Sequence, residues 1–550
     1  MMDKYYQVVC HGEKKSFIEG TTYNEIAEYF KRYYNHDILA IKVNDDFDDL
    51  SNTIKKDCVV EFFTIADEYG NKVYSRSARF ILILAVKNIF KNKARLVIQH
   101  SQNNGIYFKI EGIKDKDKLD EILTNEFQNI VDNNFLFTHL TISRLEAINY
   151  FEKKRMRDKA AILKYISNTY INLYRIDDIY DYFYGRMAYS TNQIKLFKIY
   201  SLDDGFVLST PSIFNPNEIP KKINNSLINE KFDESIAFGK SINLTNVSDL
   251  NKQISLGKIK DIILMSEAYY DNQLLKLSDD IASKKSKLVL LAGPSSSGKT
   301  TTAKKLCIYL KSKGYNTITI SLDDYFTNLK DRPKDEDGNY DFESIKAIDV
   351  KLFNEQMNAL LNNQEVRLPK FDFVKGKRYF EKEYVRLNKN DVIVVEGLHA
   401  LNEVLSSSIE KKYKYKIYIR PLASLNLDIH NHIHTSDIRK LRRIIRDSKT
   451  RGMSASDTLN MWSSIQKGEM NYIYPYQNNV NSVIDSSLMY EIGVLKTYVE
   501  PLLYSVMDSD AEYPEAIRLI NFLRNFLPIP SDDIPNDSVL REFIGGSCFK

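Results

Sequence analysis

One segment, GPSSSGKT at residues 293–300, constrains the fold of this chain more than any other. It matches GxxxxGK[ST], the pattern of a loop that holds phosphate groups. An apolar run suited to a strand precedes it at 288–292, and a helical pattern with Ala303, Leu306 and Leu310 on one face follows it. Because a strand, a glycine-containing turn and a helix in this order aim backbone N–H groups at an anion, the segment predicts a nucleotide-binding region.

The side chains of this phosphate loop (residues 293–300) predict ATP and Mg²⁺ as ligands. Lys299 adds positive charge between the β- and γ-phosphates, and the Thr300 hydroxyl is suited to Mg²⁺. We expect these residues to bind ATP: Gly293, Ser295, Ser296, Ser297, Gly298, Lys299, Thr300 and Thr301.

The residues around the loop alternate between short strand-like runs and helical stretches. This alternation is typical of a parallel sheet with crossover helices on both faces. We therefore expect an α/β region over residues 285–490 and, at 491–550, a tail that is helical and then rich in loops. The strand-like runs are 288–292, 317–321, 392–396, 416–419 and 483–485.

Two carboxylates follow strands of this expected sheet. Asp323 comes just after the run at 317–321, and Glu396 ends the run at 392–396. Parallel strands bring their carboxyl ends to one edge, so both side chains should reach the phosphate loop. There Asp323 suits the removal of a proton from an acceptor hydroxyl, and Glu396 suits Mg²⁺. The alternatives are a turn or capping aspartate and a solvated strand-end glutamate.

A helix between residues 438 and 451 is expected to carry arginines on one face and apolar side chains on the other. Such a helix can dock by its apolar face and present guanidinium groups to phosphates. A solvated basic face or an RNA-contacting helix is the alternative. The arginines are Arg439, Arg442, Arg443 and Arg446, and the apolar residues are Ile438, Leu441 and Ile445.

Composition excludes several classes of protein. The chain has 550 residues, enough for several domains, and its net charge of +4 is small for a protein that coats nucleic acid. Its four cysteines show no CxxC spacing, which argues against a disulfide scaffold and fits a cytoplasmic location. The start of the chain resembles no signal peptide, and the apolar run at 80–86 is too short to span a membrane.

Two further patterns carry little weight as metal sites. His430, His432 and His434 alternate as strand ligands would, but no Cys or carboxylate stands at a fixed spacing from them. The sequence Asp335-x-Asp337-Gly338 resembles part of a calcium loop, yet the first and twelfth positions of that loop would be Pro333 and Ser344.

The front half predicts two modules and a helix. Residues 1–66 predict two strands, a helix that starts near Thr22, and two more strands, which suggests a small α+β grasp-like unit. Residues 67–250 mix helices, such as 80–90, with strands, such as 106–110 and 194–199. Residues 251–284 contain no Pro and predict one long helix that acts as a spacer.

Residues 286–490 resemble the uridine kinase and phosphoribulokinase family of P-loop kinases. The resemblance rests on the phosphate loop and on ordered motifs: LDDYF at 322–326, NYD at 339–341, PKFDF at 369–373, VEG at 395–397, and DIRKLRRIIRD at 437–447 with RG at 451–452. It implies Asp323 as the general base for a nucleoside 5′-hydroxyl, Asp341 at the ribose, and Phe371 and Phe373 around the base. It also implies a lid of Arg443, Arg446 and Arg451, with Arg443 toward the nucleoside and Arg446 and Arg451 toward ATP.

Two positions depart from the family's pattern on the nucleobase side. Gly376 stands where uridine kinases usually have a histidine, and Met453 stands where they usually have a second arginine after Arg-Gly. The resemblance therefore leaves the identity of the base open.

Residues 1–66 resemble the TGS module, and residues 67 to about 245 resemble the editing-type domain of threonyl-tRNA synthetase, through YSRSARFIL at 74–82 and STNQIKLFK at 190–198. In that family an HxxxH and a CxxxH pair form a metal-bearing editing site. The positions that correspond here are Arg76, Phe80, Phe183 and Met187, none of which suits Zn²⁺, so no zinc is expected. The front half would then bind RNA or the kinase region of the same chain.

Together these features predict an ATP- and Mg²⁺-dependent nucleoside kinase, in which Lys299, Asp323 and Arg446 are the catalytic residues. An RNA- or ribosome-binding regulatory ATPase and a sugar kinase closer to phosphoribulokinase are the alternatives. We expect a small-molecule nucleoside as partner, a homo-oligomer and no membrane association.

Overall fold

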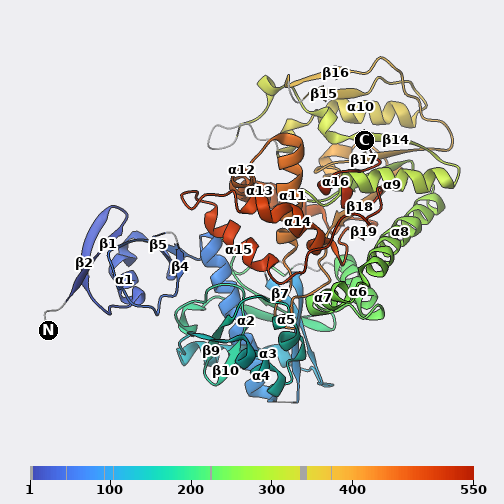
Figure 1. Ribbon diagram of the computed structural model, residues 1–550. Helices are drawn as coiled ribbons and strands as arrows, with labels where there is room; N and C mark the ends of the chain where they lie inside the picture. The colour runs from blue at the N-terminus through green and yellow to red at the C-terminus, as the bar shows by residue number, and fades with distance from the viewer. Residues whose placement is uncertain are drawn as a thin grey trace.

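The computed structural model describes residues 4–44, 46–91, 93–102, 105–222, 226–334, 343–372 and 375–549. Figure 1 shows the chain from a small N-terminal sheet, through a middle α+β region, to a larger α/β region that contains the C terminus. Within these ranges no helix is both long enough and apolar enough to cross a lipid bilayer.

The N-terminal region is a grasp-like α+β unit as expected, with one short strand, β4, beyond the four that the sequence predicts. Its five strands lie in the order β2-β1-β5-β3-β4, with β1 and β5 parallel and the other pairs antiparallel. Helix α1 begins at a capping box formed by Thr22 and Glu25 and buries Ile26 and Phe30 in a core of its own. The elements are β1 (Tyr5–Cys10), β2 (Glu13–Ile18), α1 (Tyr23–Phe30), β3 (Ile38–Val43), β4 (Asp46–Asp48) and β5 (Cys58–Thr64).

The middle region has two antiparallel sheets, β11-β12-β7-β6 and β10-β9-β8, around the long buried helix α2. The prediction of a strand at 194–199 is wrong at its start, because strand β11 begins only at Lys198. A 3₁₀ turn takes up residues 191–193, and Thr191 Oγ1 fixes that turn by donating to Ile130 O at 2.8 Å. The elements are α2 (Glu68–Phe90), β6 (Arg95–Gln102), β7 (Gly105–Glu111), α3 (Leu119–Asp132), β8 (Thr138–Ser143), α4 (Arg144–Lys153), α5 (Arg157–Leu163), β9 (Tyr170–Ile176), β10 (Ile179–Asp181), β11 (Lys198–Leu202), β12 (Gly205–Ser209) and α6 (Ser226–Ser241).

The prediction of a single spacer helix at 251–284 is also wrong. The structure has two helices, α7 (Val247–Ser255) and α8 (Ile259–Ser283), separated at Gly257, whose φ of 69° is a left-handed conformation that ends a helix. Neither helix is a spacer, because Leu250, Tyr270 and Leu274 are completely buried. Figure 1 shows α8 lying beside the C-terminal region, where it packs on α9.

The C-terminal region is built on a fully parallel sheet in the order β14-β17-β13-β18-β19. Alternate residues of the central strand β13 face opposite sides: Val289 and Leu291 join the core that contains α8, α9 and α11, while Leu290 joins the core under α10. The expected α/β fold with helices on both faces is therefore confirmed. The strands are β13 (Leu288–Ala292), β14 (Asn316–Ser321), β17 (Asp391–Glu396), β18 (Lys414–Arg420) and β19 (Ser482–Asp485), with a separate hairpin of β15 (Pro369–Asp372) and β16 (Lys377–Phe380).

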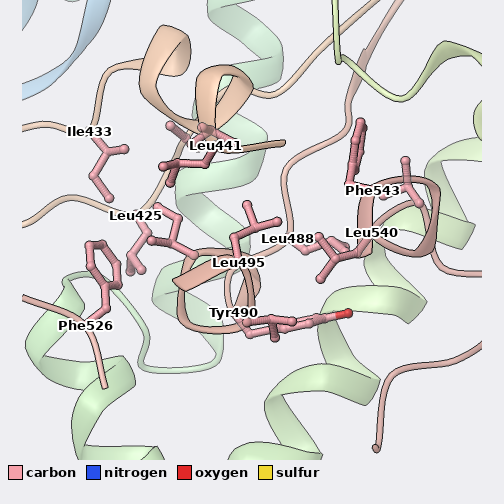
Figure 2. Close-up of a cluster of buried hydrophobic side chains, with 14 of the residues drawn as sticks. Leu425, Ile433, Leu441, Leu488, Tyr490, Leu495, Phe526, Leu540 and Phe543 are labelled. Atoms are coloured by element: carbon pink, nitrogen blue, oxygen red, sulfur yellow. The ribbon is translucent and has the colours of Figure 1, made fainter. Parts of the chain in front are cut away.

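Helices and the end of the chain close this region. Figure 2 shows Leu540, just before the last helix, and Phe543, within it, in the same apolar cluster as Tyr490 and Leu495. The tail is therefore part of the core and not a loose extension. The helices are α9 (Lys299–Ser312), α10 (Val350–Leu361), α11 (Thr435–Arg451), α12 (Ala455–Asn460), α13 (Trp462–Tyr472), α14 (Glu491–Leu503), α15 (Tyr513–Leu523) and α16 (Arg541–Ile544).

One apolar core continues from the middle region into the C-terminal region. Phe151 and Leu163, from α4 and α5, belong to the same cluster of buried side chains as Leu306 of α9 and Leu441 of α11. The division of the chain at residues 250 and 285 stays a prediction, and the packing across it is extensive.

Candidate active site

The phosphate loop lies between β13 and α9, at the carboxyl edge of the sheet. Two of its glycines are required by close packing: a Cβ at Gly293 would lie 2.1 Å from Ile419 O, and a Cβ at Gly298 would lie 2.4 Å from a methyl group of Val539. Gly298 also has a φ of 87°, which glycine adopts without strain, and it caps α9 directly before Lys299. The loop is thus shaped by its own sequence and by the C-terminal tail.

Lys299 and Thr300 lie at the start of α9. The Lys299 ammonium group donates to Gly293 O and Pro294 O, each at 3.1 Å, and so lies over the loop. Burial lowers the pKa of Lys299, against the opposing effect of the nearby Glu396 carboxylate. A partly desolvated ammonium group in this position is suited to charge on a transferring phosphoryl group.

The sheet edge brings Asp323 and Glu396 to the same place as Lys299, as the sequence predicts. Asp323 follows β14 in a 3₁₀ turn, and Glu396 is the last residue of β17. Burial, together with the carboxylates of Asp323 and Glu542, raises the pKa of Glu396 to about 7. Desolvation by the surrounding protein also raises the pKa of Asp323, although Lys299 opposes this shift.

The residues expected to hold Mg²⁺ fit that ion chemically. The Thr300 hydroxyl lies 3.5 Å from Glu396 Oε1, and both groups are hard oxygen donors. Burial and the neighbouring carboxylates raise the pKa of Glu396, which disfavours its ionised form, and a bound divalent cation would oppose this effect. Across the described residues, no group of three or more His, Cys, Asp or Glu is arranged as a metal site, which leaves phosphate and water oxygens as the other expected ligands.

Asp447, which is fully buried on α11, gathers the three arginines of the expected lid. Its carboxylate lies 2.8 Å from Arg446 Nη2, 3.0 Å from Arg443 Nε and 3.5 Å from Arg451 Nε. Arg446 and Arg451 both act electrostatically on Asp323. Arg443, expected at the nucleoside, donates to Ser295 Oγ at 2.6 Å and so contacts the phosphate loop.

The basic face expected on this helix is not solvated. Arg439 forms an ion pair with Glu469 and donates from Nε to Ser295 O at 2.8 Å. Arg442 is completely buried, pairs with Glu491 at 2.8 Å and lies 5.0 Å from the ring of Phe543. These partners come from elements far along the chain, and they turn the arginine face into part of the core that holds the loop.

The side of the site that is expected to bind the acceptor lies only partly within the described residues. Phe371 on β15 is buried and packs edge-on against Phe326, with the ring centroids 5.8 Å apart. The guanidinium group of Arg332 lies 5.3 Å from the Phe371 ring, and Asp324 accepts from Phe371 N at 3.3 Å. Asp341 and Phe373, the other residues expected at the nucleoside, lie outside the described residues.

Three glutamates of the site were missed from the sequence. Glu469 Oε1 accepts from Ser295 N–H, and Glu542 Oε2 accepts from Thr301 N–H, each at 3.1 Å. Burial and the Glu469 carboxylate raise the pKa of Glu343 to about 7. Glu343 stands two residues after the NYD motif, which is a signal that could have been used, whereas nothing near Glu469 or Glu542 in the sequence indicates a site.

The four positions that the resemblance assigns to editing-site ligands lie on α2 and on the segment 183–187 that packs against it. The rings of Phe80 and Phe183 lie 5.0 Å apart, Met187 is buried 3.6 Å from Ser77 Oγ, and Arg76 donates to Arg186 O. Apolar side chains thus occupy this space.

Residues 426–434 of the C-terminal region press against the middle region. Lys159, completely buried, lies 2.7 Å from both Asp181 and Asp428. His430 Nδ1 lies 2.6 Å from Asp181, and Ile98 N donates to Ile429 O at 2.9 Å. The histidines set aside as metal ligands therefore belong to this contact within the chain.

Comparison with known proteins agrees with this geometry. Residues 288–491 match the Phosphoribulokinase / Uridine kinase family. The match confirms the resemblance of this part of the chain to that family, and the parallel sheet with helices on both faces agrees with it. Residues 285–490 are called the kinase region, and residues 67–250 are the middle region.

Individual relatives cover different parts of the chain. A uridine kinase of Halobacterium salinarum is 28% identical over 196 residues, which are 35% of this chain and 77% of that enzyme. A threonine–tRNA ligase of Acetivibrio thermocellus is 28% identical to the N-terminal part over 197 residues, which are 35% of this chain but only 30% of the ligase. Among solved structures, D-glycerate 3-kinase of Cryptococcus neoformans var. grubii covers 48% of this chain and 89% of its own length, at 17% identity and a TM-score of 0.23.

Proposed function

We propose that the kinase region transfers the γ-phosphoryl group of ATP to the 5′-hydroxyl of a nucleoside. The observation that carries the proposal is the meeting of Asp323 with Lys299 and Glu396 at the mouth of the phosphate loop. A switch ATPase needs the loop and a magnesium ligand. It does not need a second carboxylate placed to receive a proton from a small acceptor.

In this proposal, separate side chains accept the proton and stabilise the charge of the transferred group. Asp323 accepts the proton of the acceptor hydroxyl while the oxygen of that hydroxyl attacks the γ-phosphorus, and ADP leaves. Its raised pKa makes it a stronger base than an ordinary aspartate. Lys299 stabilises negative charge on the phosphoryl group, and Mg²⁺ held by Thr300 and Glu396 would neutralise charge on the phosphates.

The arginines held by Asp447 add positive charge on the far side of the transferring group. Arg446 and Arg451 interact with Asp323, so they lie on the acceptor side of the loop. Their guanidinium forks suit two oxygens of a phosphate at once. Phe371 and Phe326, both buried, place aromatic side chains of the kind that pack beside a nucleobase on the expected acceptor side.

The test is a panel of nucleosides and sugars incubated with ATP and Mg²⁺, with the phosphorylated product identified by mass. We expect a nucleoside 5′-monophosphate as product, lost in Lys299→Ala and in Asp323→Asn, while Asp323→Asn still binds ATP in calorimetry. Asp331→Asn, on the exposed loop after β14, is the matched control and should keep activity.

Phosphorylation of sugars alone would make the chain a sugar kinase. ATP hydrolysis without any phosphorylated acceptor, unchanged in Asp323→Asn, would favour the regulatory ATPase.

A further inference from the structure

A cavity of about 580 Å³ lies between the middle region and the kinase region. Its lining includes residues of α2, β7 and β12, the end of β18, the loop at 427–434, the first turn of α11, and residues of α13 and α15. The volume falls in the range of sites for small organic ligands. It is separate from the proposed catalytic groups, since neither Lys299, Asp323 nor Glu396 lines it.

The lining carries an excess of positive charge. Lys72 and Arg518 have carboxylate partners: Glu515 pairs with both, and Asp437, which also lines the cavity, pairs with Arg518 at 2.6 Å. Arg76, Arg79 and Arg420 also line the cavity, and within the part of the chain that the structure describes none of the three forms an ion pair with a carboxylate. Each of the three donates one hydrogen bond to the described protein, Arg76 to Arg186 O, Arg79 to His430 O and Arg420 to Thr435 Oγ1, but their positive charge is not balanced there by an ion pair.

Of these groups, Arg79 gives the strongest evidence for a bound anion. Its side chain is only 7% exposed, and its Nε has no hydrogen-bond partner among the described residues. Burial lowers the pKa of Arg79 to about 10, and the two carboxylates that oppose this shift, Asp428 and Asp181, are already bonded to Lys159. Its Nη1 donates only a long hydrogen bond, to His430 O at 3.5 Å. A buried guanidinium group whose charge no carboxylate balances is costly to a fold, so its presence indicates that an anion completes the site.

Helix α11 adds a second kind of anion-binding group. Its first residues, Thr435 and Ser436, line the cavity, and no side chain caps this end of the helix. His432, which is 3% exposed, also lines the cavity and has an Nδ1 atom with no partner in the described ranges. Helix N termini and guanidinium forks are the two protein groups best suited to phosphate oxygens.

We propose that this cavity binds a phosphorylated small molecule, held by Arg76, Arg79, Arg420 and the N terminus of α11. A single carboxylate would satisfy one guanidinium fork, whereas a phosphate or diphosphate group presents enough oxygen atoms for three forks and a helix end. The ligand is distinct from the ATP and acceptor of the proposed kinase reaction.

The site is connected to the phosphate loop through α11. The same helix that begins at the cavity carries Arg439 and Arg443, which contact Ser295. A ligand that shifts the first turn of α11 therefore acts on the position of the loop. If the ligand of the cavity changes the affinity for ATP by some factor, bound ATP must change the affinity for that ligand by the same factor, because the two binding equilibria are linked.

The experiment titrates the full chain with sodium pyrophosphate, without divalent cations, in a calorimeter. Lys299→Ala serves as the background, because it weakens binding at the phosphate loop. We expect a binding event to persist in Lys299→Ala and to weaken by roughly tenfold or more when Arg79→Gln is added, the loss expected for one charged hydrogen-bonding group. Arg420→Gln, at a half-buried position, should weaken it as well.

Arg32→Gln is the matched control, since its side chain is 52% exposed and lies in the N-terminal region. It should leave the event unchanged. Thermal unfolding of each variant shows whether it is folded, and Arg420→Gln keeps the test valid if Arg79→Gln does not fold. No binding in Lys299→Ala, or binding that survives both Arg79→Gln and Arg420→Gln, would overturn the proposal without touching the kinase reaction.

Discussion

The Glu542 carboxylate occupies a donor of the phosphate loop that a nucleotide would use, so removing its charge should strengthen ATP binding. Glu542 Oε2 accepts from Thr301 N–H at 3.1 Å, within the first turn of α9. Loops of this type direct such N–H groups to phosphate oxygens. Glu542 also acts electrostatically on Lys299 and Glu396, which places its charge beside the expected triphosphate.

The magnitude follows from Coulomb's law. Two unit charges about 6 Å apart interact by about 3 kcal/mol at an effective dielectric constant of about 20. Glu542 is partly exposed, and Lys299 with Mg²⁺ would neutralise much of the phosphate charge, so about 1 kcal/mol should remain. Glu542→Gln keeps an acceptor for Thr301 N–H and removes the charge. We therefore expect it to bind ATP roughly fivefold more tightly.

The assay is calorimetric titration with a non-hydrolysable ATP analogue and Mg²⁺ at low and high salt. The gain should shrink at high salt, because it is electrostatic. Glu355→Gln is the control, since this glutamate on α10 is 62% exposed and pairs only loosely with Lys351, at 3.9 Å. Affinity that is unchanged or weaker in Glu542→Gln would refute the reasoning, and weaker affinity would mean that this carboxylate supports nucleotide binding.

Three further predictions follow from the same geometry. Arg446→Lys keeps the charge but loses the fork, so turnover should fall by about tenfold or more while RNA binding, measured by fluorescence anisotropy, stays unchanged. In EDTA, the melting temperature of Glu396→Gln minus that of wild type should be larger at pH 8 than at pH 5. The reason is that a carboxyl whose pKa is raised to about 7 loses its stabilising effect as pH rises through that value. Equal differences at both pH values would contradict this. Deletion of residues 1–66, which have their own core, should leave a soluble, folded chain by circular dichroism, whereas deletion of residues 1–250 should not, because it exposes the shared core.

The sequence was sufficient for the parts of the site that depend on local geometry. A strand, a phosphate loop and a helix follow directly from residues 288–312, and the order of strands along a parallel sheet brings Asp323 and Glu396 to one edge. Both statements need only neighbouring residues and a rule about strand ends. Gly298 shows the limit, because its requirement for glycine comes partly from Val539, far away in the sequence.

The parts that the sequence could not supply are long-range partners. The arginine pattern on α11 is compatible with a solvated face, and only the positions of Glu469 and Glu491 show that Arg439 and Arg442 are buried ion pairs. The apolar residues of 251–284 are compatible with a free amphipathic helix. Burial of both α7 and α8 depends on surfaces contributed by the middle and kinase regions together.

The contact around Lys159 joins the middle region to the kinase region, in addition to the apolar core that they share. Lys159 is completely buried, and its two carboxylate partners come from different regions, Asp181 from β10 and Asp428 from the loop at 426–434. Removal of either carboxylate would leave a buried charge short of a partner, which costs several kcal/mol. The apolar replacement of the metal-ligand positions, by Phe80 and Phe183, affects neither of these carboxylates. The side chains at 80 and 183 can therefore change without affecting this ion-pair contact, because a different set of side chains forms it.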